Sequence, residues 1–376
     1  NTVVGERGAQ GMTTATGITG VGSYVFGAGA MTGGANTAMG RQAAQEMTTG
    51  YNNTATGNSY VGFQAGLNQQ SGQYNTSVGY QAFQGSGTPA NNTGSSNAAF
   101  GTLALGGNTS GSSNTALGYS ALQSNTTASN NTAVGYQAAY SNTTGGNNTI
   151  IGYQAGYSGA SAMTAIGYQA GYTNTDNSGG TFVGYSSGKL NSTGAYNSSF
   201  GTYSLQTNST GSYNTAIGYN TLNSNTTASN NTAVGYQAAY TVTSQVQVTA
   251  LGSQALYTGG GGQEVAIGYQ AGQLTQGTNS IAIGSAAGQT GQSTQLDTHH
   301  IIEQHEFNEY KVKDGIRKDS AHNLVVLCKI HHDEVHNGNL NIYGYKDGPS
   351  GRFLDYEFKS EEIKEEIKEE KSAKED

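Results

Sequence analysis

The sequence predicts a mainly β protein: a parallel β-solenoid of about 17 coils over residues 1–290, then a small α+β domain over residues 291–357, then a charged helical tail over residues 358–376. Three observations lead to this prediction. A short motif recurs at a nearly constant interval through the first part of the chain. That part contains only seven charged side chains, and it contains none of the seven histidines. The chain therefore divides at about residue 290 into two parts of different composition.

A glycine marks the recurring motif, whose form is Asn-Thr-Ala-Val-Gly-Tyr-Gln-Ala. Ten of the sixteen intervals between successive glycines are 17 residues, and the others are 15 to 22 residues. A disordered Gly-rich chain has no reason to keep such an interval, so the pattern indicates an ordered repeat. We call these residues the tracked glycines: Gly5, Gly22, Gly40, Gly62, Gly79, Gly101, Gly118, Gly135, Gly152, Gly167, Gly184, Gly201, Gly218, Gly235, Gly252, Gly268 and Gly284.

A period of 17 residues is too short for a pair of helices but suits one coil of a β-solenoid. Alternation along the motif predicts a strand with Val134 and Tyr136 on one face and Ala133, Gly135 and Gln137 on the other. The Asn- and Gly-rich segments between motifs are typical of turns, because these residues accept left-handed backbone angles. Coils stacked at ~4.8 Å would build a rod of roughly 80 Å.

The predicted interior of each coil is thin, with two or three apolar side chains, often Ala with Val or Ile. Such a core favours association, most simply a parallel homotrimer whose apolar faces meet on a common axis. Two intervals, Gly40–Gly62 and Gly79–Gly101, are 22 residues long. Each is expected to leave the solenoid at a turn as an excursion of about five residues, because an insertion within a strand would shift its register.

The motifs "NTAVGYQA", "TAIGYQAG" and "NSIAIGSAAG" resemble the head repeats of trimeric autotransporter adhesins, and similar arrays occur in phage and algal-virus fibre proteins. The resemblance covers about residues 1–290, although the period here is longer than the usual head repeat. It implies a left-handed, trimeric β-roll in a surface fibre, either extracellular or on a virion, with a host-surface receptor or glycan as partner. No apolar run reaches membrane-spanning length.

The histidines fall in three linked stretches, "THHII", "HNLVVLC" and "HHDEVHNG". "NLVVL" is typical of a short buried strand, and "HHDEVH" is typical of a helix start. On that helix His332 and His336 lie four residues apart and share a face, which makes half of a transition-metal site. His299 and His300 are adjacent on a predicted strand, so one of them could supply a third ligand and the other a base.

These stretches resemble the HNH endonuclease motif, a ββα unit that binds one divalent metal ion. The longer segment, about residues 297–357, resembles the HNH domains of MutS-like proteins from octocoral mitochondria and giant viruses. The resemblance implies that His299, His332 and His336 hold the metal, that His300 is the general base, and that Asn323 fixes the loop that orients it. The implied cofactor is one Mg²⁺, Mn²⁺, Ni²⁺ or Zn²⁺ ion, and the implied substrate is DNA.

This segment also departs from the family pattern. Its second Cys-x-x-Cys pair is reduced to Cys328-x-x-His331 and no upstream pair exists, so no structural zinc is expected. The loop cations Lys311, Lys313, Arg317 and Lys318 either contact phosphates or are solvated loop charges. Two functions stay open at this point. The HNH-like unit is a structural tip on a fibre, or it is an active metal-dependent nuclease, a toxin or a viral DNA-processing enzyme, displayed on a rod.

Overall fold

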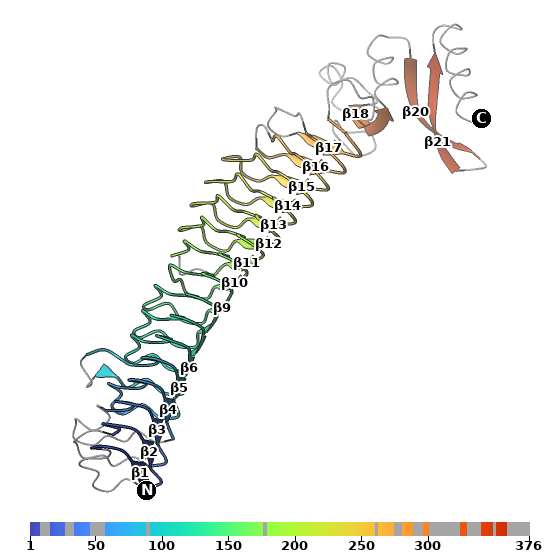
Figure 1. Ribbon diagram of the computed structural model, residues 1–376. Coiled ribbons are helices and arrows are strands. Elements are labelled where there is room, and N and C mark those ends of the chain that lie inside the picture. The colour runs from blue at the N-terminus through green and yellow to red at the C-terminus, as the bar shows by residue number, and fades with distance from the viewer. Residues whose placement is uncertain are drawn as a thin grey trace, which may run out of the picture.

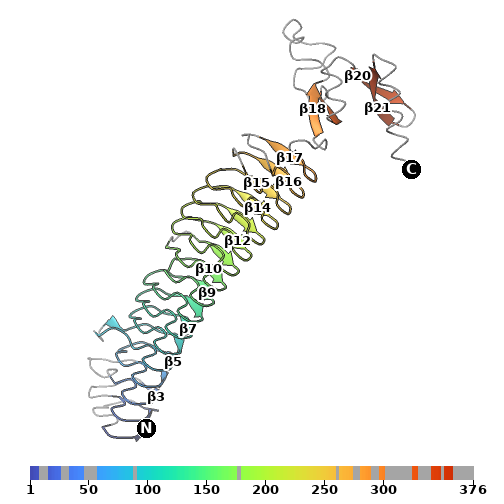
Figure 2. The same ribbon diagram turned by 45° about the horizontal axis from the view of Figure 1, so that its top comes forward.

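The computed structural model shows an elongated stack of coils with the N-terminus at one end (Figure 1). Seen from a second direction, each coil lies directly on the one before it (Figure 2). The structure describes residues 1–7, 16–26, 34–45, 57–87, 91–175, 179–259, 262–273 and 280–288 with their side chains, and residues 296–300, 324–328, 340–348 and 351–358 as backbone strands.

One 17-stranded parallel sheet runs the length of the stack, with one three-residue strand from each coil. The predicted parallel β-solenoid is therefore confirmed, and the described residues contain no α-helix. The strands are β1 (Thr2–Val4), β2 (Thr19–Val21), β3 (Thr37–Met39), β4 (Ser59–Val61), β5 (Thr76–Val78), β6 (Ala98–Phe100), β7 (Thr115–Leu117), β8 (Thr132–Val134), β9 (Thr149–Ile151), β10 (Thr164–Ile166), β11 (Thr181–Val183), β12 (Ser198–Phe200), β13 (Thr215–Ile217), β14 (Thr232–Val234), β15 (Thr249–Leu251), β16 (Val265–Ile267) and β17 (Ile281–Ile283).

A tracked glycine follows the last residue of every one of these strands. All of the tracked glycines have φ between +122° and +141°, a region that residues with a Cβ rarely adopt. In all but the last coil, a Cβ on the tracked glycine would lie 2.1–2.6 Å from the carbonyl oxygen of the next tracked glycine. The recurrence of glycine at this position thus has two physical causes, the backbone angle and the close approach of neighbouring coils.

Strand register is maintained across both long intervals, because Thr37 pairs with Ser59 and Thr76 pairs with Ala98. The additional residues therefore lie outside the strands, as expected. In the second interval, the side chain of Asn92 accepts a hydrogen bond from the Ser86 backbone N–H at 3.2 Å and donates one to its carbonyl at 2.9 Å. These bonds hold the two ends of a short segment together. The remainder of both expected excursions, residues 46–56 and 88–90, lies outside the described residues.

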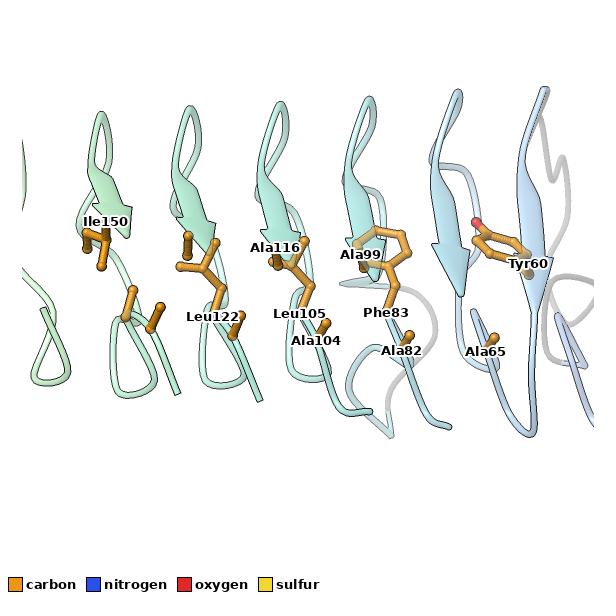
Figure 3. Packing of buried hydrophobic residues seen from close by; sticks show 14 of the residues in the cluster. Tyr60, Ala65, Ala82, Phe83, Ala99, Ala104, Leu105, Ala116, Leu122 and Ile150 are labelled. Atoms are coloured by element: carbon orange, nitrogen blue, oxygen red, sulfur yellow. The ribbon is translucent and has the colours of Figure 1, made fainter. Parts of the chain in front are cut away.

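The core lies inside the coils and is built mainly from alanine (Figure 3). The middle residue of sixteen of the seventeen strands is buried, and in most coils it is Ala. Larger side chains occupy the interior of some coils, among them Tyr60, Phe83, Leu122 and Ile150. The expectation that Val or Ile of the motif lines the interior is wrong for most coils. The apolar residue before the tracked glycine lies on the outer face, because strand residues alternate and the middle position already points inward.

Asparagine side chains form two internal ladders along the solenoid. Four residues before the tracked glycine, Asn131 donates its backbone N–H to the Asn114 side-chain oxygen at 3.0 Å, and Asn114 Nδ2 donates across the coil to the Ala128 carbonyl at 2.9 Å. Seven residues after the tracked glycine, Asn125 Nδ2 donates to Asn108 Oδ1 at 2.6 Å. The bonds of the first ladder satisfy buried backbone groups that an alanine core cannot pair. They also join each coil to the next.

The C-terminal segment contributes two antiparallel strand pairs. β18 (Leu296–His300) pairs with β19 (Leu324–Cys328), and β20 (Leu340–Gly348) pairs with β21 (Gly351–Phe358). The predicted strand at "NLVVL" is thus observed. The helix predicted at "HHDEVH" and nearly all of the charged tail, residues 359–376, lie outside the described residues. The division into rod, HNH-like unit and tail stays a prediction.

Candidate functional site

The first candidate site is the histidine-bearing strand pair of the C-terminal segment. In the β18–β19 register, His299 lies opposite Val325 and His300 lies opposite Leu324. Two strands are thus paired in the part of the sequence where a ββα unit is predicted. The other predicted site residues, Asn323, His332 and His336, lie outside the described residues. The structure therefore places two of the five predicted site residues at the end of one strand and leaves their convergence with the others a prediction.

A metal site has not been located in the described part of the chain. Within those residues, no group of three or more His, Cys, Asp or Glu side chains could hold a metal ion. Two of the three predicted ligands, His332 and His336, lie outside that part, so the ligand set stays a prediction. Cys328 is the last residue of β19. In the same described range, no helix is long and apolar enough to cross a membrane.

Comparison with known proteins finds a relative that matches part of the chain. Over 65 residues the chain is 38% identical to a putative DNA mismatch repair protein, a mutS homolog, of Acanthamoeba polyphaga mimivirus. The match covers 16% of this chain and 6% of that protein, so the chain spans only a small part of its relative's length. No family model matches the chain, and no solved structure matches it significantly. The expected resemblance of part of the chain to a MutS-like protein of a giant virus is therefore supported.

The second candidate site is the outer face of the 17-stranded sheet. Three columns of side chains run along it, at positions three residues before, one before and one after the tracked glycine. The first column is mostly Thr, and the second is apolar in all 17 coils. Nine coils place Tyr in the third column, namely Tyr80, Tyr119, Tyr136, Tyr153, Tyr168, Tyr185, Tyr219, Tyr236 and Tyr269. We call the second and third columns together the outer strip.

The tyrosines of the outer strip stack on one another from coil to coil. Ring centroids are 5.3 Å apart for Tyr119 and Tyr136, 5.0 Å for Tyr136 and Tyr153, and 4.7 Å for Tyr168 and Tyr185, with interplanar angles of 8–10°. This spacing is close to the ~4.8 Å between parallel strands, so the stack follows from the sheet itself. Most ring faces are covered by neighbouring rings, while each of the nine tyrosines remains 39–54% exposed as a whole.

Tyr203 continues this stack where the repeat has Thr202 in place of tyrosine. It lies edge-on to Tyr185, with centroids 5.3 Å apart, and edge-on to Tyr219, with centroids 6.2 Å apart. Desolvation raises the pKa of the Tyr203 hydroxyl, and the neighbouring phenols of Tyr185 and Tyr219 add to the effect. The aromatic row is therefore continuous from Tyr119 to Tyr236, across an interruption in the repeat.

Charge is confined to the N-terminal end of the outer strip. Arg41 lies over the ring of Phe63, with 5.7 Å between its guanidinium carbon and the ring centroid. Glu6 and Arg41 are the charged residues of the third column. From β4 to β17, none of the three columns contains a charged residue. The face offers apolar groups and neutral hydroxyls over most of its length.

Sequence reasoning did not identify the outer strip as a site. Its signal was present, because the residue before the tracked glycine is apolar in every coil and Tyr follows in most coils. That apolar residue was assigned to the core instead. The β20–β21 hairpin was also missed, although Gly348, Pro349 and Gly351 supply turn residues between two stretches that alternate in the manner of strands.

Proposed function

We propose that the protein is a structural surface fibre, an adhesin-like homotrimer on a virion or another extracellular surface, with a left-handed solenoid and an HNH-like tip. One observation carries this proposal: a single parallel sheet of 17 strands passes without interruption through the described coils. Stacked at ~4.8 Å, these coils form a spacer of roughly 80 Å. A host-surface receptor or glycan is the partner that such a fibre would contact.

The structure supplies a physical basis for a rigid spacer. The strand ladder bonds each coil to the next, and many neighbouring coils are also joined by the asparagine ladders or the stacked tyrosines. In repeat proteins, stability is approximately a sum of such nearest-neighbour terms. A rod of this kind holds its two ends apart.

The fibre proposal is tested by negative-stain electron microscopy and light scattering of the full chain. We expect straight rods with a length near 80 Å and a mass three times the 38.7 kDa of one chain. Compact particles would contradict the fibre. Rods with the mass of a single chain would contradict the trimer but not the fibre.

A second function, a metal-dependent nuclease displayed on the rod, is favoured by a separate observation. Two adjacent histidines end a strand that is paired with β19, and the relative of this chain is named as a DNA mismatch repair protein. In this proposal His299, His332 and His336 would hold one divalent cation, which would supply charge stabilisation at the phosphorus. His300, neutral near pH 7, removes a proton from the attacking water, and Asn323 fixes the loop that orients His300.

Plasmid nicking by the full chain, assayed with Mg²⁺, Mn²⁺, Ni²⁺ or Zn²⁺, separates the two roles of the tip. An active tip would convert supercoiled plasmid to open circle, and His300→Ala would reduce the rate by 10²-fold or more, within the usual ~10²–10⁴ range for loss of a general base. His305→Ala, which changes a histidine outside the predicted set, is the matched control. No nicking with any of the four metals would identify the tip as a structural cap.

A further inference from the structure

We propose that the outer strip is the surface through which copies of this chain associate side by side, with their rods parallel. This inference rests on the proposed fibre function, and it names the face that performs the assembly. The strip occupies the same face of every coil, because its two columns lie two residues apart on an alternating strand. The partner to which we commit is a second copy of this chain.

The exposed apolar area of the outer strip is the first argument. In the apolar column, thirteen of the seventeen side chains are exposed, for example Leu117 at 48% and Ile217 at 41%. The nine tyrosines of the other column are 39–54% exposed. With about 200 Å² for a whole Tyr and about 100 Å² for an aliphatic side chain, the strip exposes on the order of 1,500 Å².

That area exceeds what a monomeric surface usually carries. The largest apolar patch of a typical monomer is about 300–600 Å². A standard stable interface buries about 800 Å² from each partner. The outer strip would therefore suffice for a stable contact even if only about half of its length were covered.

The chemistry of the strip selects a second copy over other partners. Nucleic acid and charged surfaces require complementary charge, and the three columns carry none from β4 to β17. A sugar ring stacks on the open face of an aromatic ring. Here the faces within the row Tyr119–Tyr185 are covered by neighbouring tyrosines with centroids 4.7–5.3 Å apart. The strip thus offers ring edges and aliphatic side chains at the spacing of one coil, and another solenoid has that same spacing.

When two rods lie parallel, their coils have the same spacing along the whole length of the contact. An axis parallel to the rod brings each coil against the equivalent coil of its partner, so a contact made once is repeated 17 times. The apolar surface is also widest at the C-terminal end of the strip, where the first column beside it becomes apolar. There Val265 and Ile281 replace the threonine of the first column, and Ile281 and Ile283 are 65% and 55% exposed. We place the strongest part of the contact at these last coils.

The test introduces charge into the strip of the full chain. The variant carries Leu117→Lys, Ile151→Lys and Ile217→Lys, three exposed positions directly before a tracked glycine. Sedimentation velocity at micromolar concentration should give two or three times 38.7 kDa for the unmodified chain and 38.7 kDa for this variant. Its far-ultraviolet circular dichroism should match that of the unmodified chain.

The matched control places three lysines elsewhere on the coil, at exposed turn positions nine residues after a tracked glycine: Thr127→Lys, Thr144→Lys and Thr227→Lys. This control should keep the mass of the unmodified chain. A strip variant that stays fully associated, or an unmodified chain that sediments as a monomer, would overturn the inference. Rods that persist as monomers in electron microscopy would leave the fibre function standing.

Tyrosine nitration of the unmodified chain provides a second measurement that does not depend on the folding of a variant. In the associated state Tyr136 and Tyr153, which lie in the strip, should react at least tenfold more slowly than Tyr74 and Tyr213. The latter two lie five residues before a tracked glycine and are 64% and 59% exposed. Equal nitration of the two pairs, measured by peptide mass spectrometry, would contradict the proposed face.

Discussion

Replacing the tracked glycine Gly135 with alanine should destabilise the middle of the solenoid strongly. Gly135 follows β8 and has φ of +136°. A Cβ at this residue would lie 2.3 Å from the carbonyl oxygen of Gly152 in the next coil. The obstructing atom belongs to the backbone, so no side-chain rotation can relieve the contact.

The expected loss of unfolding free energy in Gly135→Ala has two parts. Holding alanine at this backbone angle costs about 1–3 kcal/mol. Relieving the contact requires the two coils to separate by about 1 Å, which weakens the hydrogen bonds from Gly152 N to Val134 O and from Gln154 N to Tyr136 O, both 2.8 Å long. Each such bond contributes about 0.5–1.5 kcal/mol. We expect a total loss of about 2–6 kcal/mol.

Substitutions at two other glycines distinguish the cost of the backbone angle from the cost of the contact between coils. Gly284 follows the last strand and has φ of +122°, but the nearest described atom to its added Cβ is the Ala287 Cβ at 3.8 Å. Gly284→Ala should therefore cost only the backbone term, about 1–3 kcal/mol. Gly87 has no positive φ, and no atom of the described residues lies within 4 Å of an added Cβ. Gly87→Ala should change the stability by less than about 0.5 kcal/mol.

Urea unfolding followed by circular dichroism gives the three free energies, and hydrogen exchange with mass spectrometry locates the loss. For Gly135→Ala, exchange should accelerate in peptides that contain β8 and β9 before those at either end, because coils contact only their neighbours. The reasoning would be refuted if Gly135→Ala were no more destabilising than Gly87→Ala. If Gly284→Ala lowered the free energy of unfolding as much as Gly135→Ala does, the contact between coils would not contribute to the loss.

Three further predictions concern buried hydroxyl groups. The Ser77 hydroxyl in β5 is buried without a hydrogen-bond partner, so Ser77→Ala should raise the free energy of unfolding in urea by about 1 kcal/mol. Ser199 lies 2.8 Å from the Ser187 hydroxyl and 2.6 Å from the Ser204 hydroxyl. Ser199→Ala should therefore cost only about 0.5–1.5 kcal/mol in the same assay, because the Ser187 and Ser204 hydroxyls keep the Ser199 and Gly201 carbonyl oxygens as acceptors. Burial raises the pKa of the Tyr60 phenol, and the Asn75 side chain opposes this in part. Below pH about 10 the phenol is protonated in both states. Above it the unfolded chain releases the proton first, so stability should fall as pH rises, and the fall should be shallower in Tyr60→Phe.

Much of the fold could be predicted because the same short motif recurs many times along the chain. One occurrence of "NTAVGYQA" is short and ambiguous, but 17 in phase require a stack of equivalent coils, and the tracked glycines mark each strand end correctly. The alternation that separates Val134 from Ala133 was also readable, since strand residues alternate faces. The histidine site could be proposed from spacing and resemblance, and the strands at His300 and Leu324 were found where two strands had been expected.

The sequence by itself determined the period, the parallel solenoid, the change of composition at about residue 290 and the identity of the candidate ligands. Only the tertiary structure decided which of the two strand faces is the interior. Each face carries apolar residues, Ala on one and Val, Ile or Leu on the other, so hydrophobicity alone favours the wrong side. The coil is narrow, and in most coils small alanines fill the space between its walls while the larger side chain is left outside. That geometric limit leaves the apolar residue before the tracked glycine on the surface and creates the outer strip.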